Sequence, residues 1–215
     1  MYSFDDDFFK TEYNNYYDLR EKGLKKEANK KLEELMEYFD SLDDKAKRSI
    51  CYELCRLYLE TKEISELQFP LLHRIIAILA MDCEENKMPQ MRWYYQLTGD
   101  KKMLKRAFEQ KKDDEITIYL MVESLLYELW NGALHMPYCC LLEKEKSDTL
   151  LNKLREILDS NDLSDEVIEE FEYYSNLYSD WWKFDKDLSA KGFLEWCVKN
   201  KRDYKWVKEY CFDKD

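Results

Sequence analysis

The sequence has few of the residues that interrupt helices. Its 215 residues include only four glycines and three prolines, and valine is also scarce. Leucine, glutamate and lysine are abundant instead, and these side chains lose little rotamer freedom in a helix. No stretch alternates apolar and polar residues over the length of a strand. We therefore expect an all-α fold.

The motifs of familiar catalytic sites are missing from the sequence. It contains no GxxxxGK[ST] or GxGxxG segment that would cradle a phosphate. It has no paired Glu-x-x-His motif for a di-iron centre and no CxxC pair for zinc or redox chemistry. Only two histidines are present, His73 and His135. We therefore expect no enzyme activity, no cofactor and no bound metal.

The sequence has fewer basic than acidic residues, 34 against 46, and its net charge is −12. Such a chain repels phosphate backbones, so we do not expect it to bind nucleic acid. It would attract a basic protein partner, although solubility alone also explains an acidic surface.

No long hydrophobic run is available to cross a membrane. The most apolar stretch, residues 67–83, contains Pro70, His73 and Arg74 and is shorter than a comfortable span. We interpret it as a buried core helix that is apolar nearly all round. The first ten residues, MYSFDDDFFK, are acidic where a signal peptide is basic. These features predict a cytoplasmic protein that has no contact with a membrane.

The seven cysteines do not form the framework of a secreted protein, because their number is odd and their spacing irregular. Cysteine is often buried as a small hydrophobic residue, and we interpret most of these thiols in that way. The alternative places an activated Cys139 beside His135, in a small-ligand pocket that also contains Trp130 and Tyr138. A histidine at the end of a long helix is favoured by the helix dipole without any reaction.

Helical periodicity recurs along most of the chain and predicts about 9–11 helices. Ser41, Asp43 and Asp44 offer a side-chain oxygen to cap one helix start, and Asp100 can cap the helix after Gly99, which permits a left-handed helix end. Asp113 and Asp114 begin a long helix. Ser147 or Asp148, and Ser164, are further expected caps. The main expected helices span residues 24–42, 66–85, 89–98, 113–134, 147–159, 164–183, 189–200 and 203–211.

The segment RWYYQLTGDKKMLKRAFEQKKDD, residues 92–114, carries a family resemblance. Its aromatic helix, short turn and second amphipathic run resemble a tetratricopeptide-type hairpin. In that family a small residue, here Ala107, allows close helix packing, and an aromatic residue, here Phe108, wedges beside it. Residues 20–35 show a weaker likeness. The resemblance covers about one hairpin and implies stacked antiparallel helical hairpins in an α-α superhelix.

Tyrosine pairs give a second indication of a repeat. They stand at residues 16–17, 94–95 and 173–174, at intervals of 78 and 79 residues. Such an interval is about the length of two helical hairpins in α-solenoid proteins. We therefore expect one helical-repeat domain over residues 1–215, with a softer division near 140–147.

Aromatic residues gather near the C-terminus, where residues 171–212 hold four of the six tryptophans. The neighbours Trp181 and Trp182 cannot both point into the core face of one helix, because successive residues point about 100° apart. Either one of them is partly exposed, or the last two helices cover both. Tryptophan and tyrosine dominate interaction hot spots, although core packing also uses them. The expected partner-binding residues are Trp130, His135, Tyr138, Trp181 and Trp182.

These observations favour a protein–protein interaction module without catalysis. A more specific form of this hypothesis is an immunity-type inhibitor of a basic toxin, and an acidic mimic of nucleic acid is a related alternative. The alternative from another class is an enzyme or small-ligand-binding domain with its pocket near Trp130, His135 and Cys139.

Overall fold

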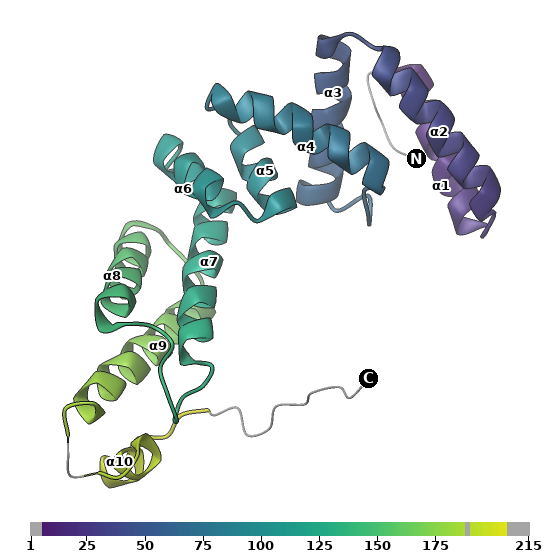
Figure 1. The fold of residues 1–215 in the computed structure, drawn as a ribbon. Helices are drawn as coiled ribbons and strands as arrows, with labels where there is room; N and C mark the ends of the chain where they lie inside the picture. The colour runs from purple at the N-terminus through teal and green to yellow at the C-terminus, as the bar shows by residue number, and fades with distance from the viewer. Residues whose placement is uncertain (1–5, 188–189, 206–215) are drawn as a thin grey trace. The chain divides into compact units, whose positions relative to one another are not determined.

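The fold is all-α, as the sequence predicted. The computed structural model describes residues 6–187 and 190–205, and within them it contains ten α-helices, one π-helical segment and no strand (Figure 1). The elements are α1 (Asp7–Glu21), α2 (Lys25–Ser41), α3 (Asp44–Cys55), the π-helical segment η1 (Arg56–Glu60), α4 (Phe69–Glu84), α5 (Gln90–Thr98), α6 (Lys101–Gln110), α7 (Glu115–Ala133), α8 (Lys144–Ser160), α9 (Asp165–Phe184) and α10 (Phe193–Lys199).

Residue contacts divide the chain into two compact units, with the boundary between Lys112 and Asp113. Unit 1 comprises residues 1–112 and unit 2 residues 113–215. The expected softer division near 140–147 falls inside unit 2, in the segment between α7 and α8.

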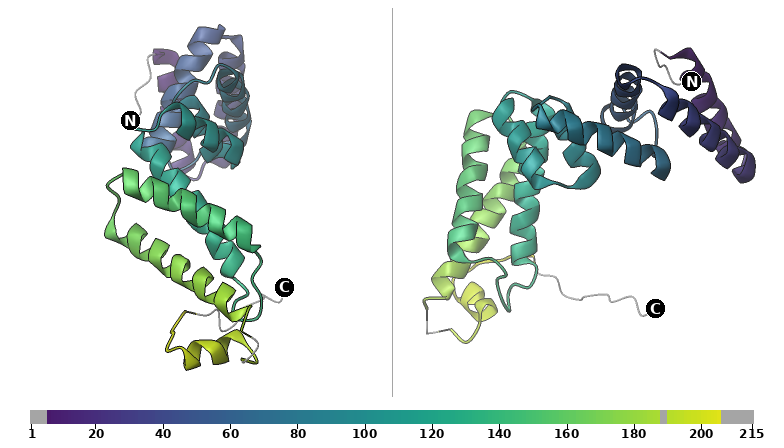
Figure 2. Two further views of the ribbon diagram at one scale, coloured as in Figure 1. Left: turned by 90° about the vertical axis from the view of Figure 1, so that its left-hand side faces the viewer. Right: turned by 45° about the horizontal axis from the view of Figure 1, so that its top comes forward.

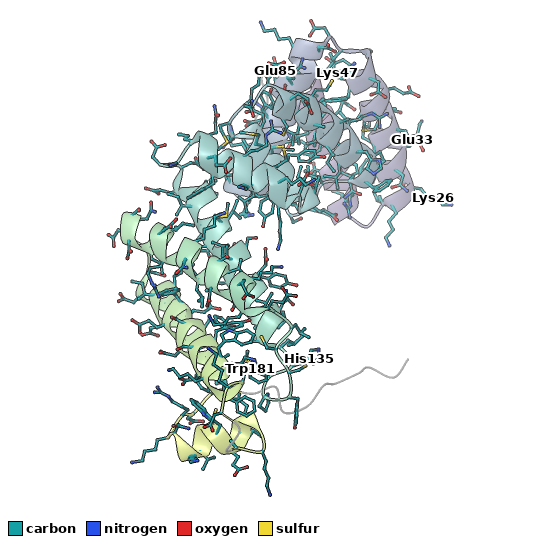
Figure 3. All side chains as sticks on the ribbon, turned by 60° about the vertical axis from the view of Figure 1, so that its left-hand side comes forward. Lys26, Glu33, Lys47, Glu85, His135 and Trp181 are labelled. Carbon is teal, nitrogen blue, oxygen red and sulfur yellow. The ribbon has the colours of Figure 1, made fainter. Side chains whose placement is uncertain are left out.

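Unit 1 is built on helical pairs that bury aromatic and aliphatic side chains. Helices α1 and α2 fold back on each other, and α4, α5 and α6 follow as successive neighbours (Figure 1). Charged side chains such as Lys26 and Glu33 of α2 project away from this core (Figure 3). The largest fully buried side chains of the unit are Phe9, Tyr13, Tyr16, Leu35, Phe39, Leu54, Leu57, Ile64, Leu71 and Ile75.

Unit 2 is built around α7, α8 and α9, which pack on one another (Figure 2). A buried hydrogen bond joins two of these helices, since the Tyr178 hydroxyl of α9 donates to the Leu129 carbonyl of α7 over 2.7 Å. The core of the unit contains Ile118, Met121, Val122, Leu125, Leu150, Leu154, Ile157 and Leu177.

Several predicted helix boundaries are confirmed with their caps. The Asp43, Asp100 and Asp114 carboxylates accept hydrogen bonds from backbone amides two or three residues later, at 2.8–3.0 Å. Gly99 ends α5 with φ +75°, a left-handed conformation that glycine adopts without steric cost. The turn at 99–100 therefore forms where the sequence predicted it.

The expected start of the helix at Ser147 or Asp148 is wrong. Helix α8 begins three residues earlier, at Lys144, and Ser147 is a fully buried residue in its interior. The Ser147 hydroxyl donates to the Lys144 carbonyl, so it bonds within the helix instead of capping it. Ser164 does precede α9, although its side chain makes no capping hydrogen bond.

The first of the two expected C-terminal helices begins later and is shorter than predicted. Helix α10 covers only Phe193–Lys199, whereas residues 189–200 were expected. Of the helix expected at 203–211, residues 203–205 are not helical and residues 206–211 lie outside the described part of the chain.

The expectation that residues 66–85 form a helix buried nearly all round is also wrong. Helix α4 buries one face, which includes Leu71, Ile75 and Leu79, whereas Phe69 and Met81 are 67% and 53% exposed. Among the described residues, no helix has the length and apolar character needed to cross a membrane.

The segment that resembles a tetratricopeptide hairpin forms α5 and α6, which pack against each other. Ala107 is fully buried and lies in a small cluster with Cys83 and Met91, so its small side chain does permit close packing. Phe108 is half-buried.

Candidate functional site

Helix α7 of unit 2 presents large apolar side chains to solvent. Ile116, Tyr119, Tyr127 and Trp130 are 41%, 50%, 57% and 43% exposed. Their spacing of three, eight and three residues places them along one side of the helix, opposite the buried core face. We call these four residues the α7 stripe. Tyr127 and Trp130 stack with ring centroids 5.5 Å apart, so two of its members form one aromatic surface.

Carboxylates surround the first half of the stripe. The pKa of the Tyr119 hydroxyl is raised mainly by the negative charge of Glu123, which also accepts a hydrogen bond from it. Partial burial and the charges of Glu166 and Glu170, on α9, raise this pKa further. Tyr119, in the first half of the stripe, therefore lies near carboxylates from two helices.

Three of the expected binding residues lie at or after the end of α7. Trp130 belongs to the stripe and also lines a crevice of about 60 Å³ with Tyr173 and Tyr174. His135 is half-buried in the turn that follows, where its carbonyl accepts hydrogen bonds from the amides of Tyr138 and Cys139. Tyr138 is 84% exposed.

The residues of the alternative ligand pocket are therefore not all gathered around one crevice. His135, Tyr138 and Cys139 are not among the residues that line the crevice beside Trp130. Cys139 is exposed, and the neighbouring Cys140 is half-buried, with a thiol whose pKa is raised by burial. In residues 6–187 and 190–205, no three His, Cys, Asp or Glu side chains are grouped so that they could hold a metal ion.

Trp181 and Trp182 have different environments, which is the first of the two outcomes that their adjacency on a helix allowed. Trp181 is 8% exposed and packs on Phe193, with ring centroids 5.0 Å apart, so it belongs to the core (Figure 3). Trp182 is half-buried, and its indole Nε1 donates to the Ser147 hydroxyl over 3.1 Å. Only Trp182 of the pair is available to a ligand.

Trp182 lines a groove between α8 and α9 that sequence reasoning missed. This α8–α9 groove has a volume of about 670 Å³. The sequence does carry a signal for this groove. Its lining residues on α8 follow one another at intervals of four, three, one and three, which places them on one side of the helix. Its lining residues on and just after α9 have the same intervals. The lining residues are Lys144, Asp148, Leu151, Asn152, Arg155, Ser175, Ser179, Trp182, Lys183 and Lys186.

Unit 1 contains a buried polar cluster that sequence reasoning also missed. Asp82 of α4 is fully buried and accepts hydrogen bonds from Tyr52 at 2.6 Å and Arg48 at 3.1 Å, and Lys87 lies 3.5 Å away. Burial, and then the bond to Asp82, raise the pKa of Tyr52 to about 12. Arg48 and Tyr52 are four residues apart, so one face of α3 presents both to the same carboxylate.

A second buried group lies close by, where Glu60 accepts hydrogen bonds from Arg92 and from the Trp93 indole. Glu60, Tyr52 and Trp93 are among the residues that line a cavity of about 510 Å³ in unit 1. Arg92 is 4% exposed, so its ion pair with Glu60 is largely removed from solvent. We interpret both clusters as structural, since each buried charge is paired with an opposite charge within the unit.

A similar buried carboxylate stabilises the end of unit 2. Asp180 of α9 is 1% exposed and binds Lys183 at 2.9 Å, Arg202 at 2.7 Å and the Tyr204 hydroxyl at 2.6 Å. Burial is the main cause that raises the pKa of Tyr204, and the bond to Asp180 adds to it. This network anchors the segment after α10 to α9.

Comparisons with known proteins found no match among protein-family models, curated proteins or solved structures.

Proposed function

We propose that this chain is a protein-binding module and that the α7 stripe is its docking surface for a basic partner. The observation that carries the proposal is the line of four exposed large apolar residues on one helix, beside the carboxylates of Glu123, Glu166 and Glu170. The proposal assigns binding to the chain and no reaction.

The composition of the stripe supports this proposal. Tyrosine and tryptophan are the residues enriched at interaction hot spots, because they bury a large apolar area and fix few rotamers. Exposed apolar side chains are common singly, but several large ones on the same side of one helix are typical of interaction surfaces. The stacked pair Tyr127 and Trp130 would form its centre.

Charge supports the choice of a basic partner. The whole chain carries −12, and the stripe itself lies beside glutamates of two helices. Complementary charge increases the association rate and suppresses acidic competitors. An immunity-type inhibitor of a basic toxin is one protein of this kind, and it remains a hypothesis within the proposal.

The larger architecture is also a proposal. We infer that the helical hairpins stack in the manner of a tetratricopeptide-like superhelix, on the basis of the α5–α6 hairpin and the buried Ala107. In that arrangement the function would belong to an exposed helical face, which agrees with the α7 stripe.

The experiment compares proteins captured from the source organism by the full chain and by the Tyr127→Ser/Trp130→Ser variant. We expect a basic protein to be captured by the wild type and lost with the variant, and its binding to weaken as salt is raised. Phe69→Ser is the matched control, because Phe69 is an equally large and exposed apolar residue of unit 1.

Circular dichroism would first show that the variants retain their helices. A partner that binds the Tyr127→Ser/Trp130→Ser variant as tightly as the wild type would refute the α7 stripe as the docking surface. Tyr138→Ser, which changes the most exposed of the expected binding residues, would show whether the surface extends beyond α7.

A further inference from the structure

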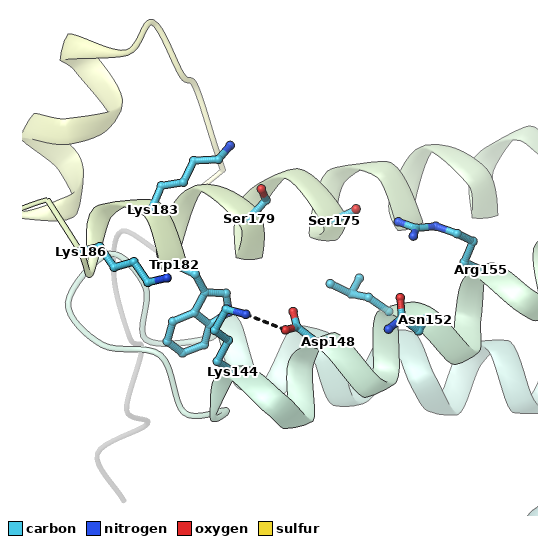
Figure 4. A pocket seen from close by; sticks show the side chains of 10 residues that line it. Lys144, Asp148, Asn152, Arg155, Ser175, Ser179, Trp182, Lys183 and Lys186 are labelled. Carbon is cyan, nitrogen blue, oxygen red and sulfur yellow. Dashed lines mark hydrogen bonds and ion pairs between the residues drawn. The ribbon is translucent and has the colours of Figure 1, made fainter.

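We propose that the α8–α9 groove is a binding site for a small phosphorylated ligand with an aromatic ring, of the size of a nucleotide. The groove brings basic side chains, hydroxyl groups and one indole from two neighbouring helices into a single cavity (Figure 4). This site is separate from the α7 stripe and opposite to it in charge.

The charge of the groove contrasts with that of the chain. Among the residues that the structure describes, four basic side chains line it and Asp148 is the only acidic one. Asp148 is already paired with Lys144 at 2.9 Å. The groove is therefore a positive region on a protein of net charge −12, which concentrates an anion locally.

Two of the basic groups remain available to an anion. Lys183 forms an ion pair with Asp180, and Arg202 forms a second ion pair with the same carboxylate. Two positive charges therefore face one negative charge, and Asp180 does not remove the positive charge of the groove. Neither Lys186 nor Arg155 forms an ion pair with another described residue, and the Arg155 guanidinium lies 5.6 Å from the Phe171 ring centroid. Arg155 therefore keeps its donors for a ligand while its orientation is restrained.

Basic side chains lie toward both ends of the groove. Lys144 and Lys186 lie at the end of the groove where Trp182 is found, and Arg155 lies toward the other end beside Ser175 (Figure 4). Lysine is a point charge that suits phosphate oxygens, and arginine can donate two parallel hydrogen bonds to one phosphate. Ser175, Ser179 and Asn152 add uncharged donors along the floor.

Trp182 provides a planar wall with a fixed orientation. Its Nε1 donates to the Ser147 hydroxyl, and Ser147 is fully buried and bonded to the Lys144 carbonyl. The indole cannot rotate without breaking this partly buried bond. An aromatic face held in this way can stack on a planar ring, as tryptophan does with nucleic acid bases.

The size of the groove favours a small ligand over a protein segment. Its volume of about 670 Å³ lies within the range of small-molecule sites, roughly 300–1,000 Å³. A free anion without a ring would leave Trp182 unused, and an apolar ring without phosphate would leave Lys186 and Arg155 without an anionic partner. A phosphorylated aromatic compound uses both features.

The experiment measures binding of ATP to the full chain by isothermal titration calorimetry at low and at physiological salt. Tripolyphosphate, adenosine and an acidic poly-glutamate peptide are the comparison ligands. We expect ATP to bind more tightly than tripolyphosphate, and adenosine and the peptide to bind weakly or not at all.

Two charge reversals then locate the site. Lys186→Glu and Arg155→Glu should each weaken ATP binding about tenfold or more, since each replaces an attractive contact with a repulsive one. Lys153→Glu is the matched control, because it makes the same charge change on α8 at a residue that does not line the groove. Trp182→Phe, which keeps a ring but loses the bond to Ser147, should weaken ATP binding and leave tripolyphosphate binding unchanged.

Four results would overturn the proposal. These are no ATP binding by the wild type, equal binding of ATP and tripolyphosphate, tighter binding of the acidic peptide than of ATP, or an equal loss of affinity in the Lys153→Glu control. The helical content of each variant, measured by circular dichroism, separates loss of the site from loss of the fold.

Discussion

A methyl group added at Gly132 should destabilise unit 2. Gly132 lies in α7 and is buried, and a β-carbon built at this position would collide with the Tyr178 hydroxyl and with the Leu142 side chain. The Tyr178 hydroxyl is not free to move away, because it donates to the Leu129 carbonyl over 2.7 Å. Glycine is therefore required here by the close approach of α9, and Gly132→Ala tests that packing.

The expected loss combines three contributions. Overpacking of a well-filled core costs about 1–3 kcal/mol. Displacing the Tyr178 hydroxyl from its buried carbonyl partner costs about another 1 kcal/mol. Replacing glycine with alanine inside a helix stabilises the helix by about 1 kcal/mol, which offsets part of this loss. The free energy of unfolding of unit 2 should therefore fall by about 2 kcal/mol.

Urea denaturation followed by tryptophan fluorescence is the suitable assay, because five of the six tryptophans lie in residues 113–215. The Tyr178→Phe variant removes the hydroxyl, so Gly132→Ala should cost less in that background than in the wild type, and the double-mutant cycle measures the coupling. An unchanged or higher urea midpoint for Gly132→Ala would refute the argument from close packing.

Three further predictions concern buried and exposed side chains elsewhere. Asp82→Asn should destabilise unit 1 by about 2 kcal/mol, measured by urea denaturation, because the basic partners of Asp82 lose their buried counter-charge but remain partly solvated. Above pH 10 the protein should lose stability as the pH rises toward 12. The native pKa values of Tyr52 and Tyr174 are raised to about 12, so the unfolded chain loses these protons at lower pH than the native protein does. The slope of the unfolding free energy against pH should therefore be shallower in a Tyr52→Phe/Tyr174→Phe variant. An equal slope in wild type and variant would contradict the assignment to these two tyrosines. A thiol reagent should modify Cys139 before Cys140, because Cys139 is exposed and the Cys140 thiol is half-buried with a raised pKa, and peptide mass spectrometry over time would detect the opposite order.

The helices were predictable because their boundaries are encoded locally. Asp43, Asp100 and Asp114 cap their own helix starts through side-chain oxygens, and Gly99 supplies the left-handed residue that ends α5. These interactions span at most four residues, so the sequence alone identifies them. The all-α fold follows from the same short-range information.

Ser147 shows where local reasoning fails. It has the chemistry of a helix cap, but it is buried inside α8 and its hydroxyl accepts the Trp182 indole N–H, 35 residues along the chain. Helix α4 shows the same limit, since an apolar composition did not reveal which face another element would cover. Tertiary partners decided both outcomes, and no spacing rule names a tertiary partner.

The candidate site was predicted in part for the same reason. Trp130 and Trp182 were expected to bind a partner because of their residue type, and the structure leaves both accessible. The groove that contains Trp182 depends on the pairing of α8 with α9. Each helix shows its face in the sequence, but only the pairing brings Lys144 and Lys186 to one end of one groove.

The position of Lys144 gives a final reason to regard the α8–α9 groove as selected for binding. Lysine in the last turn of a helix, such as Lys183 in α9, is explained by the helix dipole alone. Lys144 is the first residue of α8, where the helix dipole disfavours a positive charge. In its bond to Asp148 the basic residue comes first along the chain, and this order is less favourable than an acidic residue followed by a basic one. Lys144→Gln should therefore leave the melting temperature unchanged or raise it slightly, while weakening ATP binding. Circular dichroism would measure the melting temperature of the variant, and calorimetry its affinity for ATP. A variant that melts several degrees lower and binds ATP with unchanged affinity would assign Lys144 to stability instead of binding.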